Sequence, residues 1–286
     1  MTWRLLSMVA GLAYVAVGAA FGQDANVANS AAPNAAASAV WTKVHASVFA
    51  NAPLEPAGDV ITLDTPTRAE DAAIVPIAIR SRFPQTKERF IERVWLIVDN
   101  NPSPIAAVFN FTLESGRADI ETRIRIEEYT HVRAVALTND GKLSMAVNYV
   151  KASGGCSAPA GKDALAAKAN LGKMRLRIDE SAGPGRPALA QLMISHPNDS
   201  GLAMDQLTRN YAPPHFVRHV KVTHGGRPIM SAEVDFSISE NPNFRFYFVP
   251  DRDAALEAKI VDNQDLEFAS TTRLNSGAGS AASTLR

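Results

Sequence analysis

The sequence predicts an all-β protein with two β-sandwich domains in tandem. The first observation is that apolar and polar residues alternate with a period of two in both halves of the chain, which is typical of half-buried strands. The second is that short clusters rich in Gly, Pro, Asn and Asp separate these runs, as in sandwiches. The third is the length of 286 residues, which suggests two domains when one domain has about 150 residues.

The composition is that of a soluble globular protein. Hydrophobic residues make up 46% and charged residues 20% of the chain, which argues against intrinsic disorder. The 29 basic and 29 acidic side chains give a formal net charge of zero. Because such a chain has no bulk attraction for nucleic acid or for an acidic membrane surface, we expect no nucleic-acid partner.

The first 22 residues have the layout of a cleaved signal peptide. Arg4 is followed by an uncharged run from Leu5 to Phe21, and the segment ends with small residues at the two positions that a signal peptidase inspects, Ala20 and Gly22. The alternative is a transmembrane anchor, but the run is shorter than the roughly 20 residues that cross a bilayer. The sequence therefore predicts export, with no membrane association once residues 1–22 are removed.

Two disordered tails are predicted, at residues 23–40 and at residues 271–286. Both are rich in small residues such as Ala and Ser, and neither supplies side chains that a core would bury. Between the tails we expect a first domain at residues 41–152, a Gly- and Ala-rich arm and linker at 153–172, and a second domain at 173–270.

The first domain begins with a segment that the sequence leaves open, because Val44, Ala46 and Val48 do not settle helix against strand between Trp41 and Phe49. Four later runs have apolar residues at every second position and predict strand faces. They are Val75 to Ile79, Phe109 to Leu113, Ile120 to Ile126 and Leu143 to Tyr149. The turns that separate them are Asn100 to Pro104, Glu114 to Gly116 and Asn139 to Gly141.

The second domain shows the same period-two alternation of apolar and polar residues, but its sequence does not repeat that of the first domain. Gly225 and Gly226 predict a two-residue hairpin turn. The strand runs around this turn are Met174 to Ile178, Leu189 to Ile194, Val220 to Val222, Ala232 to Ile238, Phe244 to Phe248 and one near Ala258 to Phe268. The alternating phenylalanines Phe244, Phe246 and Phe248 indicate one face of the core rather than a binding platform.

The arm and linker between the domains, residues 153–172, combine two kinds of sequence. The first half has no large side chain, so apolar packing of its own residues cannot hold it. The second half predicts a short helix, with Asp163 as the N-cap and Gly172 just past the end.

Signatures of common enzymes are absent from the sequence. It has no His-Glu-x-x-His, no Gly-x-Ser-x-Gly and no Ser-x-x-Lys motif. His196, His215, His219 and His224 fall in the second domain, but no Cys or carboxylate accompanies them at ligand spacing. We therefore expect hydrogen-bonded imidazoles at loop ends, no metal site, no cofactor and no enzymatic activity.

Cys156 is the one cysteine of the chain, which is unusual in an exported protein. Free cysteines are commonly buried, but the small neighbours Gly154, Gly155 and Ser157 offer no apolar surface to bury this one. We therefore expect an exposed, mobile thiol, with a reach of roughly 17 Å from Lys151 along an extended chain. No charge is fixed beside it to activate a nucleophile, so it suits a handle on which other enzymes act. An accidental exposed cysteine is the remaining alternative.

The first domain resembles SoxY, the cysteine-bearing half of the sulfur-oxidation carrier. The residues that carry this resemblance are Asp71-Ala72, Val75-Pro76, Asp99-Asn100-Asn101-Pro102-Ser103-Pro104, Thr122-Arg123-Ile124-Arg125, Asp140-Gly141 and Gly154-Gly155-Cys156. The second domain resembles SoxZ. The residues in this case are Ile194-Ser195-His196-Pro197, Pro214-His215-Phe216, Ser239-Glu240-Asn241-Pro242 and Asp262-Asn263. Together the two resemblances cover about residues 45–270.

The resemblance implies two immunoglobulin-like sandwiches that pair with each other, here within one chain. It also implies a flexible arm whose cysteine carries sulfur intermediates covalently between periplasmic enzymes. Carried over to this sequence, Cys156 is the attachment site, and Gly154 and Gly155 belong to the arm. The usual arm continues with two glycines after the cysteine and then stops, whereas here Ser157 and Ala158 follow and the chain runs on. The arm is therefore a tethered loop.

The fusion of both subunits resembles the single-chain SoxYZ-like carriers associated with quinoprotein dehydrogenases. It implies a partner that uses pyrroloquinoline quinone to oxidise alcohols, with Sox-type enzymes as other candidates. The leading hypothesis is a periplasmic carrier that presents Cys156 to such enzymes. The alternatives are a non-covalent docking module for the dehydrogenase in which Cys156 is not used, and a free-standing enzyme such as a hydrolase.

Overall fold

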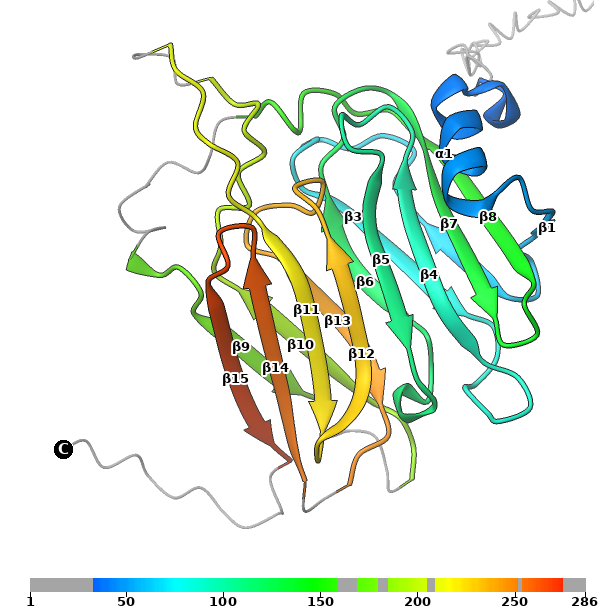
Figure 1. The fold of residues 1–286 in the computed structure, drawn as a ribbon, viewed down its shortest axis with the longest axis vertical. Coiled ribbons are helices and arrows are strands. Elements are labelled where there is room, and N and C mark those ends of the chain that lie inside the picture. The colour runs from blue at the N-terminus through cyan, green and yellow to red at the C-terminus, as the bar shows by residue number, and fades with distance from the viewer. Residues whose placement is uncertain (1–32, 159–168, 180–184, 205–208, 252–253, 275–286) are drawn as a thin grey trace, which may run out of the picture. The chain divides into compact units, whose positions relative to one another are not determined.

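Two β-sheets stack face to face and enclose the hydrophobic core (Figure 1). The computed structural model describes residues 33–158, 169–179, 185–204, 209–251 and 254–274. The predicted signal peptide, residues 1–22, lies outside these residues, as does the helix predicted to begin at Asp163 up to residue 168. One sheet has nine strands and the other has six.

Within residues 33–158, the first half of the chain forms one α-helix, two short 3-10 helices and eight strands. They are η1 (Ala35–Ala37), α1 (Ala39–Phe49), β1 (Leu54–Pro56), β2 (Ile61–Asp64), β3 (Val75–Ser81), β4 (Ile91–Val98), β5 (Ile105–Phe111), η2 (Leu113–Ser115), β6 (Ile120–Ile124), β7 (Thr130–Thr138) and β8 (Leu143–Val150). The second half contributes the other strands. They are β9 (Met174–Ile178), β10 (Ala188–Ile194), β11 (Val217–His224), β12 (Arg227–Val234), β13 (Asn243–Phe248), β14 (Ala255–Asp262) and β15 (Glu267–Arg273).

Both sheets run without a break from one half of the chain into the other. The nine strands have the order β1-β8-β7-β4-β5-β12-β11-β14-β15, and the six have the order β2-β3-β6-β13-β10-β9. The joins are the antiparallel pairs β5 with β12, where Phe109 lies opposite Ala232, and β6 with β13, where Glu121 lies opposite Arg245. The two predicted sandwiches are therefore joined edge to edge through both layers.

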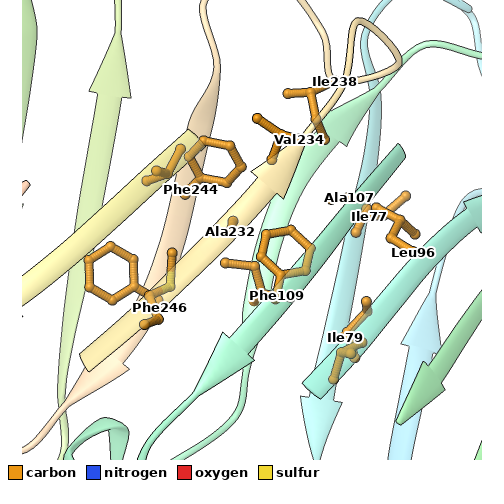
Figure 2. Close-up of a cluster of buried hydrophobic side chains, with 14 of the residues drawn as sticks. Ile77, Ile79, Leu96, Ala107, Phe109, Ala232, Val234, Ile238, Phe244 and Phe246 are labelled. Atoms are coloured by element: carbon orange, nitrogen blue, oxygen red, sulfur yellow. The ribbon is translucent and has the colours of Figure 1, made fainter. Parts of the chain in front are cut away.

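The period-two pattern accounts for the core between the sheets. Along β13 the exposure alternates, and Phe244, Phe246 and Phe248 are fully buried, which confirms the predicted core face. Phe244 meets Phe109 of the first half edge to face, with ring centroids 6.3 Å apart. One cluster of buried side chains spans both halves, and Figure 2 shows part of it. The core therefore does not divide at the predicted linker.

The segment that the sequence left open is a helix. Ser38 caps α1 by accepting a hydrogen bond from the Trp41 backbone nitrogen. The helix covers the outer face of the nine-stranded sheet, where Phe49 meets Trp95 of β4 edge to face with ring centroids 5.0 Å apart. This contact explains why an apolar residue such as Trp95 faces outward on its strand.

The structure shortens both predicted tails. Residues 35–37 form a 3-10 helix and α1 begins at Ala39, so the part of 23–40 that is described is ordered. At the other end β15 continues to Arg273, so residues 271–273 are strand rather than tail. Cross-strand pairing with β14 explains this extension, since Thr271 lies opposite Glu257.

Two strand predictions in the second half were wrong in extent. The run from Ala232 to Ile238 ends as a strand at Val234, because the chain turns there and Ile238 donates its backbone N–H to the Asp235 carbonyl. The single strand near Ala258 to Phe268 is two strands, because the Asp262 carboxylate accepts hydrogen bonds from the backbone of Gln264 and Leu266 and closes a turn. The hairpin at Gly225-Gly226 is confirmed, with positive φ at both glycines.

Within the described residues, no helix combines the length and the apolar character that a membrane crossing requires.

Because one core serves both halves, we expect the halves to unfold together. Phe244→Ala removes a fully buried ring from the second half and should lower the free energy of unfolding by about 3–5 kcal/mol. The measurement is denaturant unfolding of the mature chain followed by Trp fluorescence, which reports on Trp41 and Trp95 in the first half. The control Tyr211→Ala changes a ring that is 61% exposed and should leave the midpoint unchanged. An unchanged Trp transition in Phe244→Ala would show that the halves unfold independently.

Candidate functional site

The chain leaves β8 at Val150 and runs back over loops of the first half before it reaches Cys156. Lys151 forms an isolated parallel bridge with Arg68, and its N–H donates to the Thr67 carbonyl. We call residues Ser153 to Ser157 the carrier arm. The loops at this end of the sandwich, uppermost in Figure 1, come from both halves of the chain.

The backbone of the carrier arm is fixed by hydrogen bonds to the segment that follows β6. The N–H of Gly154 donates to the Glu127 carbonyl at 2.8 Å, and the N–H of Gly155 donates to the Ile126 carbonyl at 2.9 Å. A Cβ on Gly155 would lie 2.0 Å from the Ala72 carbonyl oxygen, closer than any side chain tolerates. Glycine is therefore required at 155 for the chain to approach this backbone so closely.

The Glu127 side chain holds the next two residues. Its Oε2 accepts from the backbone N–H of Cys156 at 2.8 Å and of Ser157 at 3.1 Å, and its Oε1 accepts from the Ser157 hydroxyl at 2.8 Å. From the second half of the chain, the Ser200 hydroxyl donates to the Cys156 carbonyl at 2.5 Å. The carrier arm is thus docked on both halves through polar contacts.

The expectation of an exposed thiol was wrong. Cys156 is 1% exposed, because loops distant in sequence cover it and its own small neighbours let them approach. Burial, together with the nearby carboxylates of Glu127 and Asp235 and against the lowering effect of Arg125, raises the pKa of the Cys156 thiol to about 12. In this docked state the sulfur is a neutral, shielded thiol.

Arg125, directly after the end of β6, connects the two halves of the chain through hydrogen bonds. Its guanidinium is buried and donates to four carbonyl oxygens of the second half, those of Pro197, Asn198, Phe236 and Ile238. Burial lowers the pKa of Arg125, while Cys156, Glu240 and Asp199 act in the opposite direction. No carboxylate among the described residues forms an ion pair with it, so the carbonyls carry the solvation of this charge.

Asn101, in the predicted turn at 100–104, positions the segment that holds the arm. Its amide nitrogen donates to the Arg125 carbonyl and to the Ser237 hydroxyl, and its amide oxygen accepts from the Glu127 backbone N–H. This turn, identified from the sequence only as a break between strands, therefore aligns Glu127.

Sequence reasoning found Cys156, Gly154 and Gly155 but missed Glu127, Ser200 and the role of Arg125. Glu127 and Glu128 are equivalent in the sequence, as two acidic residues beyond a strand. Only the tertiary contacts distinguish them, because Glu128 is exposed. A charged Arg125 beside the buried Ile124 and Ile126 was the one local signal available.

A second cluster of titratable groups lies in the second half. His215 Nε2 is 2.8 Å from Asp262 Oδ2, and His196 Nε2 is 3.5 Å from the same oxygen. Their ligand atoms lie within 4.8 Å of one another, so two histidines and a carboxylate meet as in some metal centres. The spacing of residues in the sequence did not reveal this carboxylate, because Asp262 lies at the end of β14, far along the chain from both histidines.

The tautomer of His196 argues against a metal at this cluster. Burial, reinforced by His215, lowers the pKa of His196 to about 4, so the imidazole is neutral at pH 7. Its Nδ1 accepts a hydrogen bond from the Asn198 backbone N–H, which leaves the proton on Nε2, the atom that faces Asp262. A metal ligand needs the opposite arrangement, with a bare Nε2 and a donating Nδ1. The predicted hydrogen-bonded imidazoles are confirmed at His196 and His215.

Two family models match the chain. Residues 45–156 match the family of the sulfur oxidation protein SoxY, and residues 175–273 match the family of the sulphur oxidation protein SoxZ. No curated protein shows significant sequence similarity to the chain.

Two solved structures illustrate the structural similarity. The sulfur carrier protein SoxY from Chlorobium limicola f thiosulfatophilum is 24% identical, with a TM-score of 0.33, over 38% of this chain and 89% of that one. A superoxide reductase (neelaredoxin) from Ignicoccus hospitalis is 13% identical, with a TM-score of 0.30, over 33% of this chain and 82% of that one.

The docked thiol should react slowly. A pKa of about 12 in place of about 8.5 lowers the thiolate fraction at pH 8 by about 10³, and burial restricts access as well. We expect a neutral maleimide to label Cys156 at least about 100-fold more slowly in the native protein than in the chain unfolded by guanidinium. Equal labelling rates in both states would contradict the docked arrangement.

Gly155→Ala should undock the carrier arm, because its Cβ would overlap the Ala72 carbonyl oxygen. We expect labelling of Cys156 in the folded protein to accelerate by about tenfold or more, with an unchanged unfolding midpoint. The matched control is Gly58→Ala, whose Cβ would meet nothing within 4 Å. Slow labelling in both variants would show that the arm does not depend on the close approach at Gly155.

Proposed function

Because the chain carries a SoxY domain and a SoxZ domain in tandem, we propose that it is a carrier that holds a sulfur intermediate covalently on Cys156. The domain pair identifies a sulfur-oxidation carrier protein, a class that assists enzymes rather than catalysing reactions. The attachment to Cys156 is the further step proposed for this chain.

The observation that carries the proposal is the place of the cysteine. The match to the SoxY family ends at Cys156, and this residue is the one thiol of the sequence. The small residues around it leave room for a partner active site to admit the sulfur once the arm is free. The polar contacts of Glu127 and Ser200 are compatible with repeated release, because water can replace each of them.

We propose a periplasmic location and periplasmic partner enzymes. The signal-peptide pattern of residues 1–22 supports export, and the single cysteine removes the risk of an intramolecular disulfide in an oxidising compartment. The fusion of both domains favours a quinoprotein dehydrogenase that uses pyrroloquinoline quinone, or a Sox-type enzyme, as the partner. The intrachain pairing supplies a SoxY-like half and a SoxZ-like half within one chain.

A docking module without covalent chemistry is the second candidate. The burial of Cys156 and the raised pKa of its thiol favour it, since both suppress reaction in the docked state. In that function the sandwich surfaces would bind the dehydrogenase and the thiol would stay bare.

The state of the sulfur in the native protein separates the two functions. We expect the mature protein, purified from its own periplasm without reductant, to carry extra mass on Cys156 in multiples of a sulfur atom. Dithiothreitol should remove this mass, because a thiol reductant returns an S–S bond to the free thiol. A bare thiol while the partner pathway is active would favour the docking module.

Cys156→Ser should abolish pathway activity in the native host while the protein remains folded and abundant. The change replaces one sulfur with oxygen, and serine cannot form the S–S bond that the carrier needs. The controls are Ser153→Ala, which changes an exposed residue of the same arm, and deletion of the whole protein. A silent Cys156→Ser with a defective deletion would support the docking module instead.

A further inference from the structure

The carrier arm lies in one docked position. The contacts of the arm in that position determine which chemical groups on the Cys156 sulfur can be accommodated there. Cys156 is 1% exposed, and a Cβ on the preceding Gly155 would lie 2.0 Å from the Ala72 carbonyl oxygen and 2.8 Å from that of Ile126. A group added to the sulfur must therefore displace packed atoms, which a close-packed site resists.

Charge adds a second restriction. Three charged side chains act on the Cys156 thiol, of which Glu127 and Asp235 are carboxylates and Arg125 is the one cation. The two terminal nitrogens of the Arg125 guanidinium already donate to four backbone carbonyls, so turning them toward a new anion would cost those hydrogen bonds. Among the described residues that act on the thiol, an anionic group on the sulfur would thus lie near two carboxylates and one cation that is already engaged by carbonyls.

Glu127 both holds the carrier arm by hydrogen bonds and places a negative charge near the sulfur. Its carboxylate accepts three hydrogen bonds from Cys156 and Ser157 and is at the same time a negative charge close to the sulfur. The contacts that hold the bare arm are therefore made by a group that repels an anionic cargo.

We propose that Glu127 is the positioning residue of the unloaded carrier, and that an anionic sulfur group bound to Cys156 releases the carrier arm from its docked position. This inference rests on the proposed function. The bare thiol is hidden and the loaded arm is presented, so partner enzymes meet the loaded carrier in preference to the empty one. When a nucleophile attacks the outer sulfur of the cargo, the Cys156 sulfur leaves with the electron pair of the S–S bond and takes up a proton, and the neutral thiol allows the arm to dock again.

The test compares three forms of the mature full-length chain. One has the bare thiol, one carries a neutral 2-hydroxyethylthio group and one carries an anionic 2-sulfonatoethylthio group. Each adduct is made from the corresponding methanethiosulfonate. The Cys156 thiolate attacks the thiosulfonate sulfur, a protein–S–S–R bond forms, and methanesulfinate leaves with the electron pair of the broken S–S bond.

The readout is hydrogen exchange at the backbone amides of Gly154 to Ser157, which are donors in the docked state. We expect slow exchange in the bare protein and exchange at least about tenfold faster in the anionic adduct, with the neutral adduct slower than the anionic one. Exchange in the anionic adduct as slow as in the bare protein would overturn the proposal. Equal exchange in both adducts would overturn the role of charge.

Matched variants test Glu127 itself. Glu127→Gln should speed exchange of the arm in the bare protein and reduce the difference between the anionic and neutral adducts, because the repelling charge is gone. Glu128→Gln, at the exposed neighbouring residue, should change neither. If Glu127 only fixed the structure of the arm, Glu127→Gln would leave the difference in hydrogen exchange between the anionic and neutral adducts unchanged. Exchange of the amides in β7 and β8 reports whether each variant is folded.

The outcome is independent of the native cargo, since the adducts are made chemically. If native protein never carries sulfur but the anionic adduct releases the arm, the proposed function fails and the release mechanism stands. If native protein is loaded but the anionic adduct stays docked, the release mechanism fails and the carrier function stands.

Discussion

The antiparallel pairing of β5 with β12 and of β6 with β13 is the constraint on which the rest of the structure depends. Each join turns what would be an exposed sheet edge in a separate sandwich into a paired strand, and so removes a site of unwanted association. It also brings Phe109 and Phe244 together, so that residues from both halves complete one core. Fusion of the two domains into one polypeptide keeps the partner strands at high effective concentration.

The same joins determine where the thiol lies. With the strands aligned across the two halves, the loops after β6 and β10 meet at one end of the sandwich, and Arg125 reaches the carbonyls of Pro197 and Asn198. Ser200 then follows directly and contacts the backbone of Cys156. The docking position of the arm is thus built mainly on the first half, through Glu127 and Ile126, and is completed by Ser200 of the second half.

In the proposed function, the chain has to shield its thiol in one state and expose it to a partner enzyme in another. Docking through polar contacts permits both states. Apolar burial of a large side chain would hold the arm firmly, but the segment has none, and its amides bond instead to Glu127 and Ile126. Hydrogen bonds of this kind contribute little net free energy, because water replaces them when the arm leaves. The Gly- and Ser-rich composition of the arm therefore favours reversible docking as well as access to narrow sites.

Local pattern by itself predicted strands such as β3, β8, β10 and β13, the Gly225-Gly226 hairpin and the buried Phe244 face, and it singled out Cys156, because alternation and turn chemistry are properties of neighbouring residues. It left Trp41 to Phe49 undecided, since only the contact with Trp95 gives the helix a surface to cover. Tertiary structure alone decided the burial of Cys156, the choice of Glu127 over Glu128 and the meeting of His196 with Asp262. The physical reason is that burial and electrostatics depend on which segments, distant in sequence, come together in the fold. The local sequence of the arm does not indicate which loops pack against it.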